Sequence, residues 1–183
     1  AGSGKVDGGA SFNGTSAKIT TALANTTIGT PFTVEGWVNF TDVTRTEVPL
    51  SIGNSILVPN SATDMRWQQD TAPFPFTKVT TSRSNNTFYH IVVTSTGSGA
   101  GNTLMYLNGV SAGDGADGGT LQSGDFVFAH QIGGGSGPRY FSGTLDVVRG
   151  SSVARSADWI ATEYNIQSAT STFYSYGGEG AQI

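Results

Sequence analysis

The 183-residue sequence contains no cysteine and only two histidines, and charged residues make up just 12% of it. The lack of cysteine excludes disulfides, thiolate metal sites and cysteine nucleophiles, and two histidines far apart in the chain do not favour a zinc site. The nine Lys and Arg residues form no cluster, so the basic footprint of a nucleic-acid-binding protein is missing. No hydrophobic run approaches the roughly 18 residues of a membrane span. We therefore expect no nucleic-acid partner and no membrane insertion.

Small polar residues are abundant instead. The sequence holds 26 Gly, 24 Thr and 20 Ser, which together make 70 of the 183 residues. These residue types are poor in helix interiors, which excludes a helical bundle, while 37% hydrophobic and 10% aromatic residues exclude a disordered chain. A Cys-free, Thr-rich, Lys-poor composition fits an exported protein of a bacterium, archaeon or phage, so we expect an extracellular or cell-surface location.

Short runs of alternating hydrophobic residues predict strands. The alternation is clearest over residues 32–40, and residues 87–96 are apolar on both faces, as in the middle of a sandwich. Residues 103–111 predict a hairpin, because Asn108-Gly109 accepts the positive φ values of a type I′ turn. Ser156 can cap a helix that ends near residue 167. Shorter strand candidates cover residues 10–12, 17–20, 48–52, 55–58, 65–69, 126–132, 141–148 and 173–176.

This order of elements predicts an all-β fold. The expected architecture is a two-sheet antiparallel β-sandwich, or jelly roll, with one short helix near the C-terminus. We expect residues 1–176 to form a single domain and residues 177–183 to form a flexible tail or linker.

Four segments, in order, carry a family resemblance. They are residues 9–14 (GASFNG), 32–38 (FTVEGWV), 88–94 (FYHIVVT) followed by 104–109 (LMYLNG), and 141–149 (FSGTLDVVR). Together they resemble the concanavalin A-like lectin/glucanase superfamily, in its laminin G-like branch. Residues 154–167 are similar to a subgroup found in envelope and exported proteins of bacteria and archaea. The resemblance implies the sandwich fold and leaves the function open, because this fold carries sugar binding, protein binding, glycan cleavage and structural roles.

Sugar binding needs an aromatic ring to stack on a sugar face and planar polar groups to bond its hydroxyls. Arg66, Trp67 and Gln69 provide this mixture within one short segment, and Arg139 with Tyr140 provides it before the last long strand. Both groups are candidate carbohydrate-binding sites. The alternative for Trp67 is a place in the core, where we also expect Trp37 and Trp159.

A calcium ion is the one cofactor that the resemblance implies. Many members of the superfamily place a structural calcium between the turn after the first strand and an aspartate on the closing strand, and the matching residues here are Asn13, Gly14 and Asp146. An aspartate within an apolar strand needs a partner, because an unpaired buried carboxylate is costly. Calcium would meet that need, and so would Arg149 or a backbone amide.

Glycan cleavage needs two carboxylates facing each other across the glycosidic bond. The 13 acidic residues contain no such pair at a suitable spacing, and Glu35 is the single acid on its strand. His90 matches a strand position that favours a role in the core. His130 flanks a Gly-rich loop and fits either a surface or a site position, and no nucleophile elbow in the sequence supports a catalytic triad. We therefore do not expect an enzyme.

The sequence thus predicts a non-catalytic recognition module of an exported or surface protein. Its expected partner is a glycan or surface polysaccharide, together with other domains of a larger surface protein. The alternative is a structural or adhesive module of a surface protein, filament or virion without a small ligand. A glycoside hydrolase or lyase is the third hypothesis.

Overall fold

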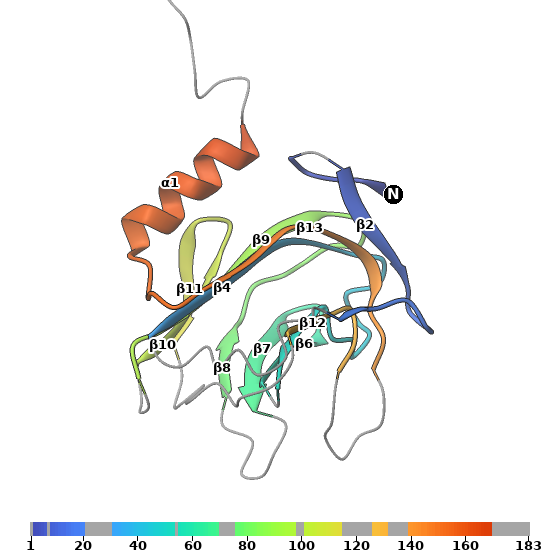
Figure 1. Ribbon diagram of the computed structural model, residues 1–183, viewed down its shortest axis with the longest axis horizontal. Helices are drawn as coiled ribbons and strands as arrows, with labels where there is room; N and C mark the ends of the chain where they lie inside the picture. Colours follow the sequence, from blue (N-terminus) through green and yellow to red (C-terminus); the bar gives the residue numbers. More distant parts are fainter. Residues whose placement is uncertain are drawn as a thin grey trace, which may run out of the picture.

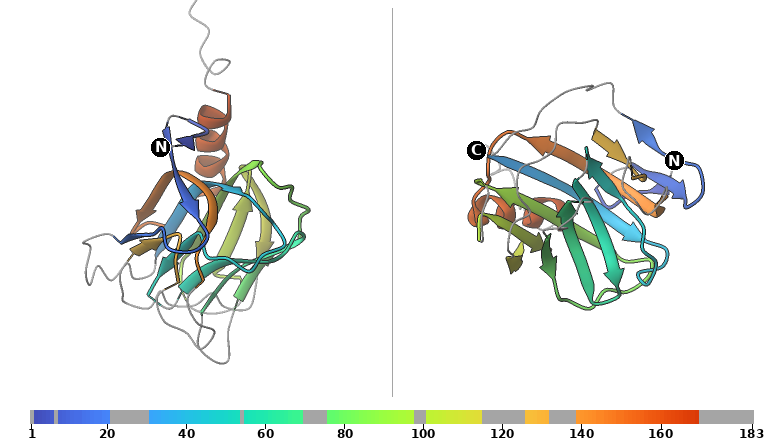
Figure 2. Two further views of the ribbon diagram at one scale, coloured as in Figure 1. Left: turned by 90° about the vertical axis from the view of Figure 1, so that its right-hand side faces the viewer. Right: turned by 90° about the horizontal axis from the view of Figure 1, so that it is seen from below.

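The computed structural model describes residues 2–6, 8–20, 31–53, 55–69, 76–97, 101–114, 126–131 and 139–169. Two antiparallel sheets pack face to face, and one helix lies outside them (Figures 1 and 2). The seven-stranded sheet has the order β1 (Gly2–Ser3), β2 (Gly8–Asn13), β13 (Ser142–Ser151), β4 (Phe32–Phe40), β9 (Phe88–Ser95), β10 (Thr103–Leu107) and β11 (Val110–Asp114). The six-stranded sheet has the order β3 (Ile19–Thr20), β12 (Phe126–Phe128), β5 (Leu50–Ile52), β6 (Ser55–Ser61), β7 (Asp64–Gln69) and β8 (Phe76–Val79). The predicted β-sandwich is confirmed.

The alternation along β4 explains how this strand holds the molecule together. Phe32, Val34 and Val38 point into the space between the sheets and belong to the main core. Glu35 and Trp37 point to the opposite face, yet they are also buried, with exposed fractions of 4% and 2%. Both faces are covered because the helix α1 (Ala157–Ser168) lies over the outer face of the seven-stranded sheet (Figure 1).

Helix α1 begins as predicted. The Ser156 side chain accepts a hydrogen bond from the backbone N–H of Trp159, at 3.3 Å, which satisfies one of the unpaired donors at a helix start. Ile160 is wholly buried and packs against Val92 and Tyr106 on the outer face of the sheet. No helix in the described part of the chain is long and apolar enough to cross a membrane.

The local predictions have different outcomes. Asn108 and Gly109 have φ values of 52° and 78°, so the hairpin turn between β10 and β11 is confirmed. Strand β8 was not predicted from the sequence. The predicted strand at residues 173–176 and the predicted tail at residues 177–183 lie outside the described residues.

A chain of polar contacts fixes α1 to the sheet. The indole Nε1 of Trp37 donates to Gln167, whose amide nitrogen donates to Glu163. Arg149 on β13 forms ion pairs with both Glu163 on the helix and Glu35 on β4, the second with Nε 2.9 Å from Oε1. We call these five residues the helix latch. Because they are supplied by β4, β13 and α1, they couple the helix to the centre of the sheet.

The helix latch should weaken in acid. Burial raises the pKa of the Glu163 carboxyl, but hydrogen bonds from Arg149 and Gln167 outweigh this effect and hold the pKa below its ordinary value of 4.5. A carboxyl whose pKa is lower in the folded state stabilises the fold above its unfolded pKa, and loses that contribution as the pH falls through the folded pKa. We expect Glu163→Gln to cost about 1 kcal/mol of unfolding free energy at pH 7 and to cost less at pH 3. Urea unfolding at a series of pH values checks this, and a cost that is the same at both pH values would contradict it.

Candidate functional site

The first predicted sugar site, at residues 65–69, is not assembled in the structure. Trp67 is wholly buried in the core, and its ring packs against Phe32 with centroids 6.3 Å apart. Arg66 is partly exposed and is held in a two-bond ion pair with Asp64 on its own strand, at 2.7 and 3.1 Å. The Gln69 side chain lies outside the described part of the molecule.

The reason is the geometry of a strand, in which successive side chains point to opposite faces. Trp67 and Arg66 are neighbours in sequence, so they cannot present one common surface when one of them points into the core. The prediction that Trp67 stacks on a sugar is therefore wrong, and its alternative, a core position, is confirmed.

The second predicted sugar site is placed at an accessible end of the sandwich. Arg139 and Tyr140 are both partly exposed, and Tyr140 forms an isolated β-bridge with His130. The two rings lie 4.5 Å apart between centroids, at an angle of 46°. Burial and the nearby charge of Lys18 lower the pKa of His130 below its ordinary value of 6.5, so this imidazole is neutral at pH 7. We call Lys18, His130 and Tyr140 the rim cluster.

The rim cluster was only partly visible in the sequence. Tyr140 was predicted, His130 was left open between a surface and a site position, and Lys18 was missed. More than 110 residues separate Lys18 from His130 in the sequence, and no motif in the sequence links them. They meet because β3, which directly follows Lys18, pairs with β12, which ends two residues before His130.

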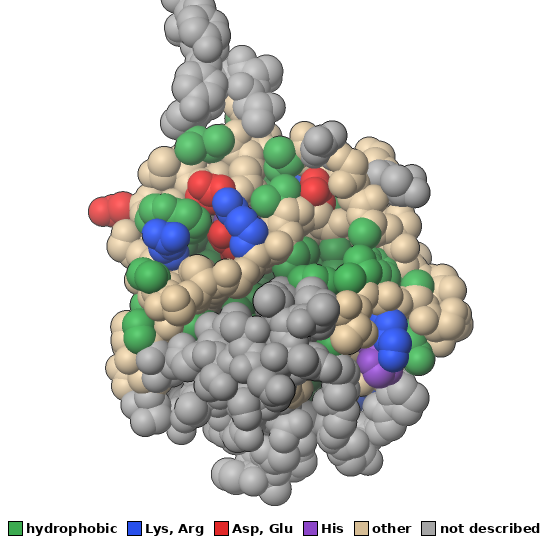
Figure 3. All heavy atoms as spheres, in the orientation of Figure 1, with side chains coloured by type: hydrophobic (Ala, Val, Ile, Leu, Met, Phe, Trp, Pro, Cys, Tyr) green, Lys and Arg blue, Asp and Glu red, His purple; other side chains and the backbone are tan. Residues whose placement is uncertain are grey.

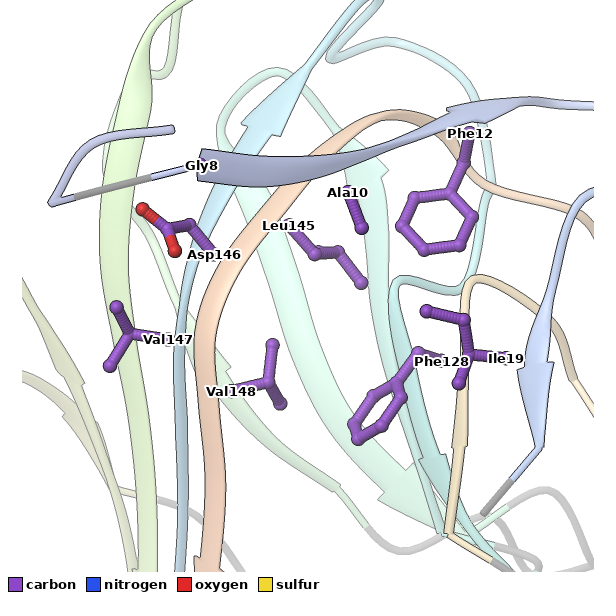
Figure 4. Close-up of a pocket in the computed structure, with 9 residues that line it drawn as sticks. All are labelled: Gly8, Ala10, Phe12, Ile19, Phe128, Leu145, Asp146, Val147 and Val148. Atoms are coloured by element: carbon purple, nitrogen blue, oxygen red, sulfur yellow. The ribbon is translucent and has the colours of Figure 1, made fainter. Parts of the chain in front are cut away.

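A hollow at the open side of the sandwich lies next to the rim cluster. Its walls come from β2 and β13 of one sheet and from β3 and β12 of the other, and its volume is about 200 Å³ (Figure 4). We call its apolar lining the edge groove: Ala10, Phe12, Ile19, Phe128, Leu145 and Val148. An adjoining hollow of about 490 Å³ shares part of this lining and continues to Ala17 and Lys18. The edge groove therefore leads towards the rim cluster.

The edge groove is open because the strands at this side are short. Strand β3 has two residues and β12 has three, so the described strands leave part of the core uncovered at this side, and Ile19 is 43% exposed. In Figure 3, hydrophobic side chains gather in a band across the middle of the face shown. Apolar side chains at an open sheet edge form a surface that can be covered by a ligand.

A β-bulge in β13 shapes one wall of the edge groove. The register with β4 shifts between Asp146 and Arg149, and Val147 within this bulge has a φ of +46°, an unusual value for a β-branched residue. Gly36 lies beneath the bulge, and a Cβ atom there would come within 3.1 Å of the Val148 side chain. Bulges redirect side chains and are frequent beside functional sites.

The three residues that the family resemblance assigned to calcium do not form one ligand set. Asn13 Oδ1 accepts the backbone N–H groups of Thr15, Ser16 and Ala17, each at 3.0 Å, while Gly14 supplies the positive φ, 71°, of the same turn. Asn13 lies opposite Ser142, and Asp146 is four residues further along β13, or about 13 Å at the rise of a strand.

The Asp146 carboxylate has partners of another kind. Its Oδ2 accepts the backbone N–H groups of Lys5 and Val6, at 2.8 and 2.9 Å, so the backbone-amide alternative is confirmed. Among the residues that the structure describes, no group of three or more His, Cys, Asp and Glu side chains could hold a metal ion. The three residues predicted to bind calcium, Asn13, Gly14 and Asp146, therefore do not meet at one common site.

The described acidic residues near the edge groove and the helix latch lie apart from one another. Asp146 is the one carboxylate among the described residues that line the edge groove. Glu35 lies on the other side of the sheet, within the helix latch. His90 is 1% exposed, with its ring centroid 5.1 Å from Trp37 and 6.1 Å from Tyr164, so its predicted core role is confirmed. The edge groove thus presents no pair of facing carboxylates among the described residues.

The sequence matches a known protein family, and the architecture is similar to those of solved structures. A family model described as the concanavalin A-like lectin/glucanases superfamily matches residues 13–161. No curated protein sequence matches the chain.

Several solved structures are similar to this one. Domain 4 of an extracellular arabinanase from Geobacillus stearothermophilus, in complex with arabinotriose, has a TM-score of 0.70 and 19% identity over 87% of this chain and 78% of that one. A heptameric SAP-like pentraxin from Limulus polyphemus has a TM-score of 0.61 and 15% identity, over 84% and 80% of the two chains. Trypanosoma rangeli sialidase, in complex with sialic acid, has a TM-score of 0.66 and 20% identity over 91% of this chain, but only 29% of the sialidase is covered. These likenesses concern the fold.

Proposed function

Because the chain belongs to the concanavalin A-like lectin/glucanases superfamily, we propose that it is a non-catalytic carbohydrate-binding module of an exported or surface protein, with the edge groove and the rim cluster as its binding site. This proposal rests on one observation, that the edge groove is continuous with the rim cluster. An open apolar groove formed by both sheets leads to an accessible tyrosine, a neutral imidazole and an ammonium group.

The chemistry of these groups suits a sugar chain. The phenyl and aliphatic side chains of the edge groove can cover the C–H surface of a sugar ring, and the Tyr140 ring offers a second apolar face. The Tyr140 hydroxyl and the neutral His130 both donate and accept hydrogen bonds, while Lys18 donates. Sugar hydroxyls need this combination, because they also act both as donors and as acceptors.

The relatives support this assignment by analogy. One similar domain was solved with arabinotriose bound and is part of a larger arabinanase, and in the sialidase the similar region covers less than a third of the enzyme. A fold of this kind therefore occurs as one part of larger glycan-active proteins. Asp146 is the one carboxylate among the described residues that line the hollow of the edge groove, which favours binding over cleavage, since hydrolysis of a glycosidic bond needs two.

The proposal is tested with Tyr140→Ala. We expect wild-type protein to bind members of a glycan array that includes arabinotriose, and the variant to bind the same glycans at least tenfold more weakly, or about 1.4 kcal/mol. Unfolding free energy should change by less than about 1.5 kcal/mol, the value of an aromatic pair. Tyr140→Phe keeps the ring and should retain most of the binding. Calorimetry with the strongest array ligand gives the affinities.

Matched controls separate binding from folding. Val110 is 68% exposed on β11, at the other end of the seven-stranded sheet, so Val110→Ala should bind as the wild type does. Unchanged binding by Tyr140→Ala would overturn the assignment of the site. An array without any binding, together with self-association of the protein, would instead favour a structural or adhesive module.

A further inference from the structure

A second hollow lies on the outer face of the seven-stranded sheet, where α1 begins. Its volume is about 220 Å³, and its described lining comes from β4, β13 and the start of the helix. We call it the helix pocket: Thr33, Glu35, Arg149, Gly150, Ser151, Arg155 and Trp159. Figure 3 shows basic, acidic and hydrophobic side chains gathered together at the upper left, beside α1. At roughly 30 Å³ for each water molecule, this space could hold about seven waters.

Arg155 is the notable side chain in this pocket. Its guanidinium carbon lies 4.6 Å from the ring centroid of Trp159, and no ion pair to Arg155 occurs among the described residues. A guanidinium stacked on a ring uses its flat face, and the N–H groups along its edge stay free to bond a planar anion. Trp159 was predicted to belong to the core, but it is only partly buried and holds this arginine in place.

The backbone around Arg155 is also fixed. The N–H of Arg155 donates to the Thr33 hydroxyl at 2.9 Å, and that hydroxyl donates to the carbonyl of Val153 at 2.6 Å. Thr33 is on β4, so the centre of the sheet positions the segment that carries Arg155. A binding group that is already held in place loses little conformational entropy when a ligand arrives.

One of the two guanidinium groups in the helix pocket has no carboxylate partner among the described residues. Its lining contains two guanidinium groups, on Arg149 and Arg155, and one carboxylate, on Glu35. Arg149 is already engaged by Glu35 and by Glu163 in the helix latch. The positive charge of Arg155 is therefore the one that a ligand can neutralise.

We propose that the helix pocket is an oxyanion-binding site, in which Arg155 makes a two-bond contact with the carboxylate or sulfate group of a small ligand. Guanidinium groups favour such anions because two parallel N–H donors match two oxygens of the anion. The pocket is large enough for the anionic group and part of the ring that carries it, as in a uronic acid. The helix pocket is on the outer face of the seven-stranded sheet, whereas the edge groove opens onto the core at the inner face. This proposal therefore does not depend on the proposed function.

Three compounds of different charge test the proposal by calorimetry and by NMR on the folded protein. Glucuronate carries a carboxylate on a sugar, inorganic sulfate is a free oxyanion, and glucose is neutral. We expect saturable binding of glucuronate, no saturable binding of glucose, and shifts confined to residues 149–159, including the Trp159 indole. Binding of sulfate as tight as that of glucuronate would support an oxyanion site that ignores the sugar, whereas weaker sulfate binding would support recognition of the acidic sugar.

Substitutions locate the binding. Arg155→Gln should weaken glucuronate binding at least tenfold, and Arg155→Lys should fall between this variant and the wild type, because an ammonium group keeps the charge without the two-bond geometry. Arg45→Gln removes the same charge from a distant arginine that pairs with Glu47, and it should bind as the wild type does. Equal binding by Arg155→Gln and wild type, shifts at the rim cluster instead, or no saturable shift at millimolar glucuronate would each overturn the proposal.

Discussion

Trp67→Ala should lower the free energy of unfolding by about 3–5 kcal/mol, the range for truncating a fully buried aromatic side chain. The side chain is 0% exposed, lies on the inner face of β7 and packs against Phe32 across the core. Its removal forfeits the transfer energy of the indole and leaves a cavity between two sheets that cannot collapse freely. Small domains are stabilised by only about 5–15 kcal/mol, so this loss is a large fraction of the total.

Urea unfolding followed by circular dichroism gives the cost directly. Trp67→Phe is the matched variant, because it keeps most of the buried ring surface. The indole Nε1 is buried and has no hydrogen-bond partner among the described residues. Phenylalanine therefore also removes an unsatisfied donor, and we expect a cost below about 1.5 kcal/mol. If Trp67→Ala lowered the free energy of unfolding by less than about 1 kcal/mol and abolished glycan binding, Trp67 would be a sugar-stacking residue and its place in the core would be contradicted.

Gly143→Ala should cost at least about 3 kcal/mol, since backbone strain and overpacking each cost about 1–3 kcal/mol. Gly143 is at the centre of the seven-stranded sheet, paired with Phe12 on one side and with Phe40 on the other. Its φ is +155°, and an added Cβ atom would be 2.0 Å from the backbone oxygen of Asn39 and 2.6 Å from the Phe141 ring. Neither the strand nor the buried ring can move away cheaply.

Chemical denaturation also tests this second prediction, with another glycine as its control. A Cβ atom at Gly97 would have no neighbour within 4 Å, so Gly97→Ala should change the free energy of unfolding by less than about 0.5 kcal/mol. If Gly143→Ala were equally mild, β13 would have to shift relative to β4. Loss of the ion pairs of Arg149 with Glu35 and Glu163 would then reveal that shift.

Local patterns in the sequence predicted elements whose determinants are close together in the chain. The alternation of Phe32, Val34 and Val38 predicted β4. The pair Asn108-Gly109 predicted the turn between β10 and β11, and Ser156 predicted the start of the helix. Strand period, positive φ and capping all act within a few residues of the chain. Strand β8 (Phe76–Val79) was not predicted, because its two apolar residues are three positions apart and do not follow the period of two that marks a strand face.

Site residues were harder to predict, because a site depends on which faces of which strands meet. Arg66 and Trp67 have the composition of a sugar site, but alternation along β7 sends one side chain outwards and the other into the core. Asn13 and Asp146 occupy the positions that the family resemblance indicates, yet each is satisfied by nearby backbone N–H groups.

The sequence by itself determined the fold class, the order of the main strands and the helix, because these follow from short-range periodicity and turn chemistry. The superfamily was indicated separately, by the resemblance of four segments, and the family model matches residues 13–161. The tertiary structure alone decided which polar groups became neighbours. Pairing of β3 with β12 brings Lys18 to His130, and docking of α1 brings Arg155 and Trp159 to Thr33 and Arg149. Lys18 and His130, like Thr33 and Arg155, are more than 100 positions apart in the sequence, and only the packing of sheets and helix brings them together.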